Sequence, residues 1–214
     1  MRLRYRHRTT ASLTLAAAVL TASLTGCTDP QSSPTGEPTP TETVTVTASP
    51  SPAALVIPDC EQLVPIESIR QVERWSEVIL IQTMEGPALA GNLPGPLARD
   101  AATRAQQNRG CLLGVPQSDS AVGVYTLDID APTRDNLIDA LRADGGFAES
   151  EIDGAPSFAF ATDEGLGGTT VSYTFVGDAW LILRGSLIDS ETAAHVAAPA
   201  VAELRAANPG LDER

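Results

Sequence analysis

The sequence contains no lysine, and all 14 of its basic residues are arginines, four of them within the first eight positions. All 27 acidic residues lie after residue 27, so the chain beyond that point carries a formal charge of (14 − 4) − 27 = −17. Nucleic-acid binding needs cations that neutralise phosphates, and docking on an anionic lipid surface needs a basic patch. We therefore expect no nucleic acid among the partners of this protein.

Histidine is nearly absent, since only His195 remains beyond His7. Nucleophilic hydrolysis by a serine needs a histidine base that an acid orients, and a serine held on a sharp turn. The sequence has no Gly-x-Ser-x-Gly elbow to supply that turn. His195 lies among alanines in a predicted helix, where packing or exposure accounts for it. We expect no catalytic residue and interpret the chain as a non-enzyme.

Aromatic residues make up only 4% of the sequence, so few are available to line a sugar-binding cleft. A glycosidase needs two carboxylic acids about 5–9.5 Å apart in such a cleft. Five acids could supply the pair, and we interpret them as part of a solvated face. They are Glu149, Glu151, Asp153, Asp163 and Glu164.

Two loop motifs lack a residue that their chemistry requires. Residues 165–170 are glycine-rich, but they contain no lysine and lie between two predicted strands, whereas a phosphate cradle opens a helix. Asp128, Asp130 and Asp135 resemble the start of a calcium loop, but Thr133 stands where that loop needs glycine. We expect Asp130 to cap a helix instead. We expect no metal site and no cofactor.

The N-terminal region has the layout of an export signal. Residues 1–8 carry four arginines and no acid, and residues 11–24 form an apolar stretch of 14 residues. A membrane-spanning helix needs about 20 apolar residues, so a cleavable signal over residues 1–26 is the better interpretation.

The end of this signal, Leu24-Thr25-Gly26-Cys27, resembles the lipobox of bacterial lipoprotein precursors. Leucine lies three positions before the cysteine, and a small residue lies directly before it. The resemblance implies cleavage between Gly26 and Cys27, a diacylglyceryl thioether on Cys27, and acylation of the new amino group. Two acyl chains hold a protein stably in a membrane where one is marginal. The alternative is ordinary secretion with Cys27 left free.

The two other cysteines, Cys60 and Cys111, are predicted to form a disulfide in an oxidising compartment outside the cytoplasm. Closing a loop of about 50 residues contributes roughly 4 kcal/mol in the chain-entropy model. The alternative is that both thiols are reduced and buried. A metal site is a poorer interpretation, because two cysteines without a neighbouring histidine fall short of four ligands.

Residues 27–54 are interpreted as the lipidated cysteine followed by a tether. Residues 28–52 are rich in Thr, Pro and Ser, and six prolines oppose helices and central strands. Such a composition buries too little apolar surface to offset its ordering entropy, so we expect disorder. At about 3.1 Å per residue, 25 residues reach roughly 75 Å from the membrane.

Residues 55–210 are predicted to form one globular domain, followed by a tail over residues 211–214. Strands are predicted at 122–129, around Phe158 and Phe160, and in a hairpin at 171–187 that turns at Gly177-Asp178. Residues 78–81 fit either a strand or the end of a helix. Helices are predicted at about 97–107, 132–143 and 190–207. These elements indicate an α+β fold, with an antiparallel sheet of five or six strands and helices packed mainly on one face.

The beginning and middle of this domain resemble a group of actinobacterial cell-envelope lipoproteins of unassigned function. The resemblance rests on Cys60 followed by Leu63-Val64-Pro65, and on Arg109-Gly110-Cys111 leading into a strand. In those proteins a tryptophan often lies two residues after the second cysteine, where this chain has Leu113. The resemblance implies a disulfide-stapled α+β domain and carries no catalytic residue across.

Together these observations predict a lipid-anchored protein on the extracytoplasmic face of the cell membrane. Its domain is expected to be a non-enzymatic module that binds an envelope ligand or a protein partner. One alternative is a lipid or glycolipid carrier, which needs a cavity lined by the inward faces of residues 171–187. A second is a small hydrolase, which needs an acid pair or His195 in a pocket with a strongly perturbed pKa.

Overall fold

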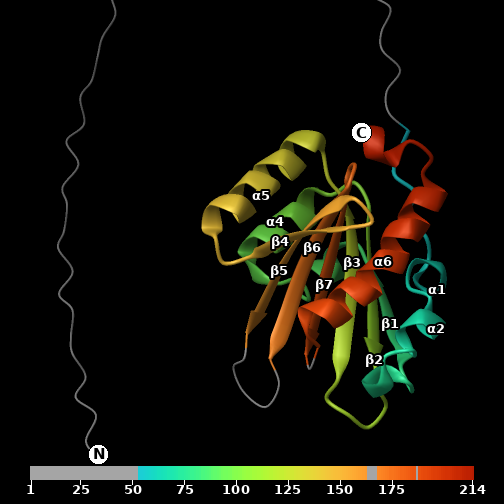
Figure 1. The fold of residues 1–214 in the computed structure, drawn as a ribbon. Helices are drawn as coiled ribbons and strands as arrows, with labels where there is room; N and C mark the ends of the chain where they lie inside the picture. The colour runs from blue at the N-terminus through green and yellow to red at the C-terminus, as the bar shows by residue number, and fades with distance from the viewer. Residues whose placement is uncertain (1–52, 163–167, 187) are drawn as a thin grey trace, which may run out of the picture. The chain divides into compact units, whose positions relative to one another are not determined.

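A seven-stranded antiparallel sheet forms the centre of the computed structural model, which describes residues 53–162, 168–186 and 188–214 (Figure 1). The strand order is β1-β2-β3-β7-β6-β5-β4. The strands are β1 (Ile79–Glu85), β2 (Asn108–Gly114), β3 (Ala121–Asp128), β4 (Ala148–Ile152), β5 (Ala155–Thr162), β6 (Thr169–Val176) and β7 (Ala179–Ser186).

Short helices α1 (Cys60–Leu63) and α2 (Ile66–Ile69) and the 3-10 turn η1 (Glu73–Trp75) precede the sheet in the chain. Helices α3 (Pro87–Ala90) and α4 (Gly95–Arg104) connect β1 to β2, and α5 (Ala131–Asp144) connects β3 to β4. Helix α6 (Ser190–Ala207) and the turn η2 (Leu211–Glu213) follow β7. The predicted boundaries of the last helix are confirmed.

The predicted hairpin is confirmed: β6 and β7 pair from Thr169↔Ser186 to Val176↔Ala179 around Gly177-Asp178. Leu187, the last residue of the predicted hairpin, lies outside the described residues. The predicted alternation of β3 is also confirmed, because Val122 and Val124 contribute to one core and Tyr125 and Leu127 to another.

Helices cover both faces of the sheet, so the expectation that they pack mainly on one face is wrong. On the first face, Leu181 and Leu183 of β7 lie in a core with the apolar side of α6. On the second face, Trp180 and Ile182 of the same strand share a core with α4 and α5. Figure 1 shows α6 crossing one face while α4 and α5 lie across the other. Because β7 is apolar at successive positions, both of its faces have to be covered.

The sheet has seven strands where five or six were expected, because the sequence analysis missed β4. Four of the five residues of β4 are exposed, and Glu149 and Glu151 interrupt any apolar alternation. The strand exists because it pairs with β5 along its length. The turn Asp153-Gly154, with positive φ at both residues (50° and 77°), is the local signal for this hairpin.

The predicted disulfide is present: Cys60 of α1 is bonded to Cys111 of β2, with a Cα–Cα distance of 5.6 Å. Both cysteines are buried in the core of the first face. The bond ties the segment that enters the domain to the second strand of the sheet.

Residues 211–214, expected from the sequence as a tail, pack against the domain. Leu211 of η2 is 1% exposed and belongs to the core of the first face. The Arg134 guanidinium donates to the main-chain oxygens of Gly177 (3.0 Å) and Arg214 (2.6 Å). Arg214 in turn donates to the carbonyl of Ala53 at 2.9 Å. The two ends of the described domain therefore lie side by side, at the end of the sheet where β6 turns into β7.

Candidate functional site

The structure places His195 on the exposed side of α6, where its Nε2 lies 2.9 Å from the main-chain oxygen of Ser68. This contact joins α6 to α2 and involves no nucleophile. Cys27, the predicted lipidation site, lies outside the described residues.

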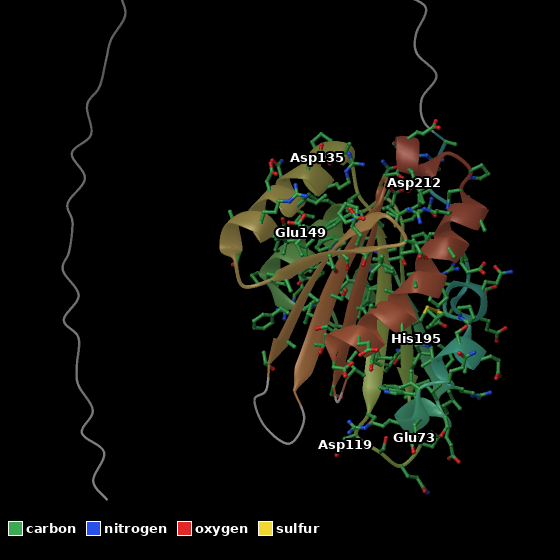
Figure 2. All side chains as sticks on the ribbon, viewed as in Figure 1. Glu73, Asp119, Asp135, Glu149, His195 and Asp212 are labelled. Atoms are coloured by element: carbon green, nitrogen blue, oxygen red, sulfur yellow. A yellow bond between two sulfur atoms is a disulfide. The ribbon has the colours of Figure 1, made fainter. Side chains whose placement is uncertain are left out.

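Of the acidic residues singled out in the sequence, Asp135 lies on α5 and Glu149 on β4 (Figure 2). Asp130 caps α5, as predicted, by accepting from the Thr133 amide at 2.7 Å. Asp135 pairs with Arg134 at 2.9 Å, and Glu149 pairs with Arg142 at 2.7 Å. Asp163, Glu164 and residues 165–167 are outside the described part of the chain. Within the residues that are described, no three His, Cys, Asp or Glu side chains are grouped to hold a metal ion.

The buried Asp128 and the partly exposed Asp178 lie where the C-terminal segment meets the sheet. Asp128, at the end of β3, is 8% exposed. Burial raises the pKa of its carboxyl, the nearby Asp178 raises it further, and Arg214 opposes both effects. Arg214 lies 3.6 Å from Asp178. Asp128 lines a cavity of only about 150 Å³, smaller than ligand pockets of about 300–1,000 Å³. We interpret this pair as part of the clamp on residues 211–214.

Asp128→Asn is expected to raise the melting temperature by a few degrees at pH 7. The folded-state pKa of Asp128 is raised. Its contribution to stability is therefore full below the unfolded pKa of about 4 and lost as the pH rises through the folded value. The gain from Asn should disappear on acidification to about pH 4, as thermal melts across this range would show. The exposed Asp139→Asn is the control, and an Asp128→Asn melt below wild type at pH 7 would contradict the assignment.

Two of the larger grooves on the described surface contain polar groups that are already paired within the chain. The first, about 500 Å³, is lined by Glu85, Asn108 and Arg109 among others. There Arg109 pairs with Glu85 at 2.7 Å, and Asn108 accepts from the Gly86 amide at 2.6 Å. The second, about 520 Å³, includes Asp189, whose carboxylate caps α6. These groups are therefore occupied within the chain.

The hairpin that a lipid carrier would need as a cavity wall is packed on both sides. Trp180, Leu181, Ile182 and Leu183 of β7 are each at most 1% exposed. They contact the cores on the two faces of the sheet, so side chains fill the space beside this strand.

Helices α4 and α5 leave one half of the second sheet face uncovered, and this half combines exposed apolar side chains with a charged one. We call it the open face. Ile79, Ile81 and Phe160 are 44%, 55% and 40% exposed. The open face consists of Ile79, Ile81, Leu112, Phe160, Val171 and Arg184.

Strand register places Arg184 at the centre of this surface. Six strands contribute one row of paired residues, and β7 lies in the interior of the row. The row reads Gln82 (β1), Leu112 (β2), Gly123 (β3), Arg184 (β7), Val171 (β6) and Phe160 (β5). The only charge in the row is therefore flanked by apolar side chains and a glycine.

The Tyr125 ring lies flat on the sheet and brings its hydroxyl beside Arg184. A Cβ on Gly123 would overlap that hydroxyl, and a Cβ on Gly110 would lie 2.8 Å from the ring carbon Cδ1. Glycine at both positions is what allows the ring to lie flat. Burial raises the pKa of Tyr125, and the Arg184 charge opposes that shift. Two hydrogen-bond donors, a phenol and a guanidinium, thus lie together at the border of the open face.

A chain of aromatic rings in contact supports the Phe160 side of the open face. Phe147, from the connection between α5 and β4, lies 5.7 Å from Phe160 and 5.5 Å from Tyr173, measured between ring centroids. Tyr173 in turn lies 5.4 Å from the buried Trp180. Phe160 is therefore the exposed end of a chain of rings that reaches into the core, which makes it a rigid contact point.

This surface was not predicted from the sequence, although the sequence contains one signal of it. Arg184 lies on the same side of β7 as Trp180 and Ile182. A charged residue therefore follows two apolar residues on that side of the strand. This side of the strand is exposed at Arg184 because α4 and α5 do not reach it, which the pattern of alternation does not indicate.

Comparisons with known proteins place the chain in no family: a scan against protein-family models, a search of curated proteins and a search of solved structures return no match. Over the part of the chain that the structure describes, no helix combines the length and the apolar character that crossing a bilayer requires.

Proposed function

We propose that this protein is a membrane-anchored extracytoplasmic lipoprotein and that its domain is a non-enzymatic binding module of the cell envelope. The open face is its binding surface. The observation that carries this proposal is a group of exposed apolar side chains around one unpaired arginine, on a sheet face that is otherwise covered. Exposed apolar patches of this kind mark interaction sites, and aromatic residues and arginine are enriched at interfaces.

The described domain begins at the end of the sheet away from the open face. The chain enters the domain at Ala53, which bonds Arg214 beside the turn at Asp178. Arg184 is six residues from Asp178, which corresponds to about 20 Å along a strand. A tether that starts at Ala53 and leads to a lipid on Cys27 therefore attaches at the end of the sheet opposite the open face.

Cys27→Ala is expected to release the protein from the membrane into the medium. Without the thiol no diacylglyceryl group is added, and the domain has no other apolar anchor in this proposal. Fractionation of cells, with mass measurement of the native N-terminus, tests the expectation. Thr25→Ala is the matched control, because alanine at this position keeps the lipobox pattern and should leave the protein attached. Retention of Cys27→Ala at the membrane would contradict the anchor.

A photo-crosslinking residue placed at position 160 tests the binding surface. We expect it to form adducts with an envelope component in intact cells. The same residue at Ala202, exposed on α6 over the opposite face of the sheet, should form few. Equal yields at the two positions would contradict the role of the open face.

A further inference from the structure

The charge at the centre of the open face restricts what can bind there. Ten arginines lie between residues 53 and 214, and seven of them form ion pairs with acids in the described chain. Arg184 forms no ion pair or hydrogen bond with any described residue. Burying an unpaired guanidinium is costly. Any partner that covers the open face therefore has to supply an anion at its centre.

This requirement argues against a second copy of the chain. Two open faces packed about a two-fold axis would bring the Arg184 side chains of both copies together, because this residue is central to the patch. Like charges placed opposite each other are destabilising. The flanking residues Leu112, Val171 and Phe160 bring no carboxylate that could compensate.

The shape and charge of the domain argue against a lipid. Ligand pockets enclose most of an apolar ligand, whereas Ile81, Phe160 and Ile79 lie on the open side of a sheet at 40–55% exposure. An anionic bilayer surface would repel the part of the chain beyond residue 27, which has a net charge of −17 and offers one arginine on this face.

A protein segment can supply both apolar side chains and an anion. The hydrogen-bonding groups of its backbone decide its conformation. A strand laid flat on the face of a sheet would have its amide and carbonyl groups buried without partners. A helix pairs these groups internally and presents an apolar stripe. Helices α4 and α5 already cover the adjoining half of the same face. The row from Leu112 to Phe160 crosses five strands, so its four spacings of about 4.8 Å span roughly 19 Å, the length of about 13 helical residues.

We propose that the open face binds an amphipathic helix of another envelope protein, and that an aspartate or glutamate near the middle of this helix pairs with Arg184. The helix places apolar side chains on Leu112 and Ile81 to one side and on Val171 and Phe160 to the other. The Tyr125 hydroxyl donates a second hydrogen bond to the same carboxylate. This inference rests on the proposed function, because it names the partner of the same surface.

The test uses the full-length lipoprotein in its own bacterium, with the photo-crosslinking residue at position 160. Mass spectrometry maps the adduct, and the crosslinked segment is synthesised as a peptide for titration against the purified protein. We expect a helical, apolar segment with a central acid. Arg184→Glu should weaken peptide binding at least tenfold, and Arg184→Lys should keep it within about threefold. Arginine in place of the acid of the peptide should restore binding to Arg184→Glu.

Several outcomes would overturn the proposal. An adduct with lipid, with a second copy, or with residues 28–52 of the same chain would name another occupant. Unchanged binding of the peptide by Arg184→Glu would also overturn the proposal. Melting temperatures of both Arg184 variants within about 2 °C of wild type establish that a loss is not unfolding. Equal adduct yields at positions 160 and 202 would refute the proposed function itself, whereas adducts at position 160 that ignore the Arg184 charge would refute the helix inference alone.

Discussion

Cys60→Ala is expected to lower the melting temperature of the domain by roughly 8–16 °C. The disulfide closes a loop across a sequence separation of 51, and its loss releases about 4 kcal/mol of loop entropy into the unfolded state. For a domain of this size, each kcal/mol corresponds to about 2–4 °C. Both sulfurs are buried, so the variant also leaves Cys111 as an unpaired thiol in the core of the first face.

Thermal melts of wild type with and without a reducing agent provide the control for this variant. Reduction should lower the melting temperature of wild type by a similar amount and leave Cys60→Ala unchanged. The bond ties α1, near the start of the described domain, to β2. A wild-type melt that is insensitive to reduction would show that the bond contributes nothing.

Gly177→Ala is expected to destabilise the domain by about 2–5 kcal/mol, which corresponds to roughly 4–20 °C. Gly177 has φ +54°, a left-handed conformation that costs other residues about 1–2 kcal/mol. A Cβ at this position would also overlap the main-chain oxygen of Leu211. The turn between β6 and β7 or the segment 211–214 has to move, and overpacking of this kind costs about 1–3 kcal/mol. Urea unfolding monitored by circular dichroism measures the effect.

Gly154→Ala is the matched control for this steric effect. Gly154 has φ +77°, so it carries the same conformational penalty, but a Cβ there would have no neighbour within 4 Å. We expect it to cost only the conformational part, about 1–2 kcal/mol. Equal losses in the two variants would mean that the C-terminal segment does not pack against the β6–β7 turn in solution.

The clamp and the open face lie at opposite ends of the sheet. Arg134, Gly177 and Arg214 hold the two ends of the described domain together. The binding surface that we propose lies about 20 Å away along β7.

Local patterns in the sequence were sufficient for the elements whose apolar residues follow one period. The hairpin of β6 and β7 and the helix Ser190–Ala207 were predicted because period-two and period-3.6 patterns are strong there. The bond between Cys60 and Cys111 was predicted from the cysteine count together with the predicted export signal. The role of Asp130 as a helix cap followed from its position before Pro132.

Tertiary structure alone decided which surfaces are covered. Strand β4 forms because β5 offers it a pairing edge, although its own residues are polar. Helices cover both faces because β7 is apolar in both phases, and a pattern of alternation does not say what lies against each phase. Arg184 becomes the centre of an open face because α4 and α5 end before they reach it. Burial depends on the positions of elements distant in sequence, and no local pattern contains that information.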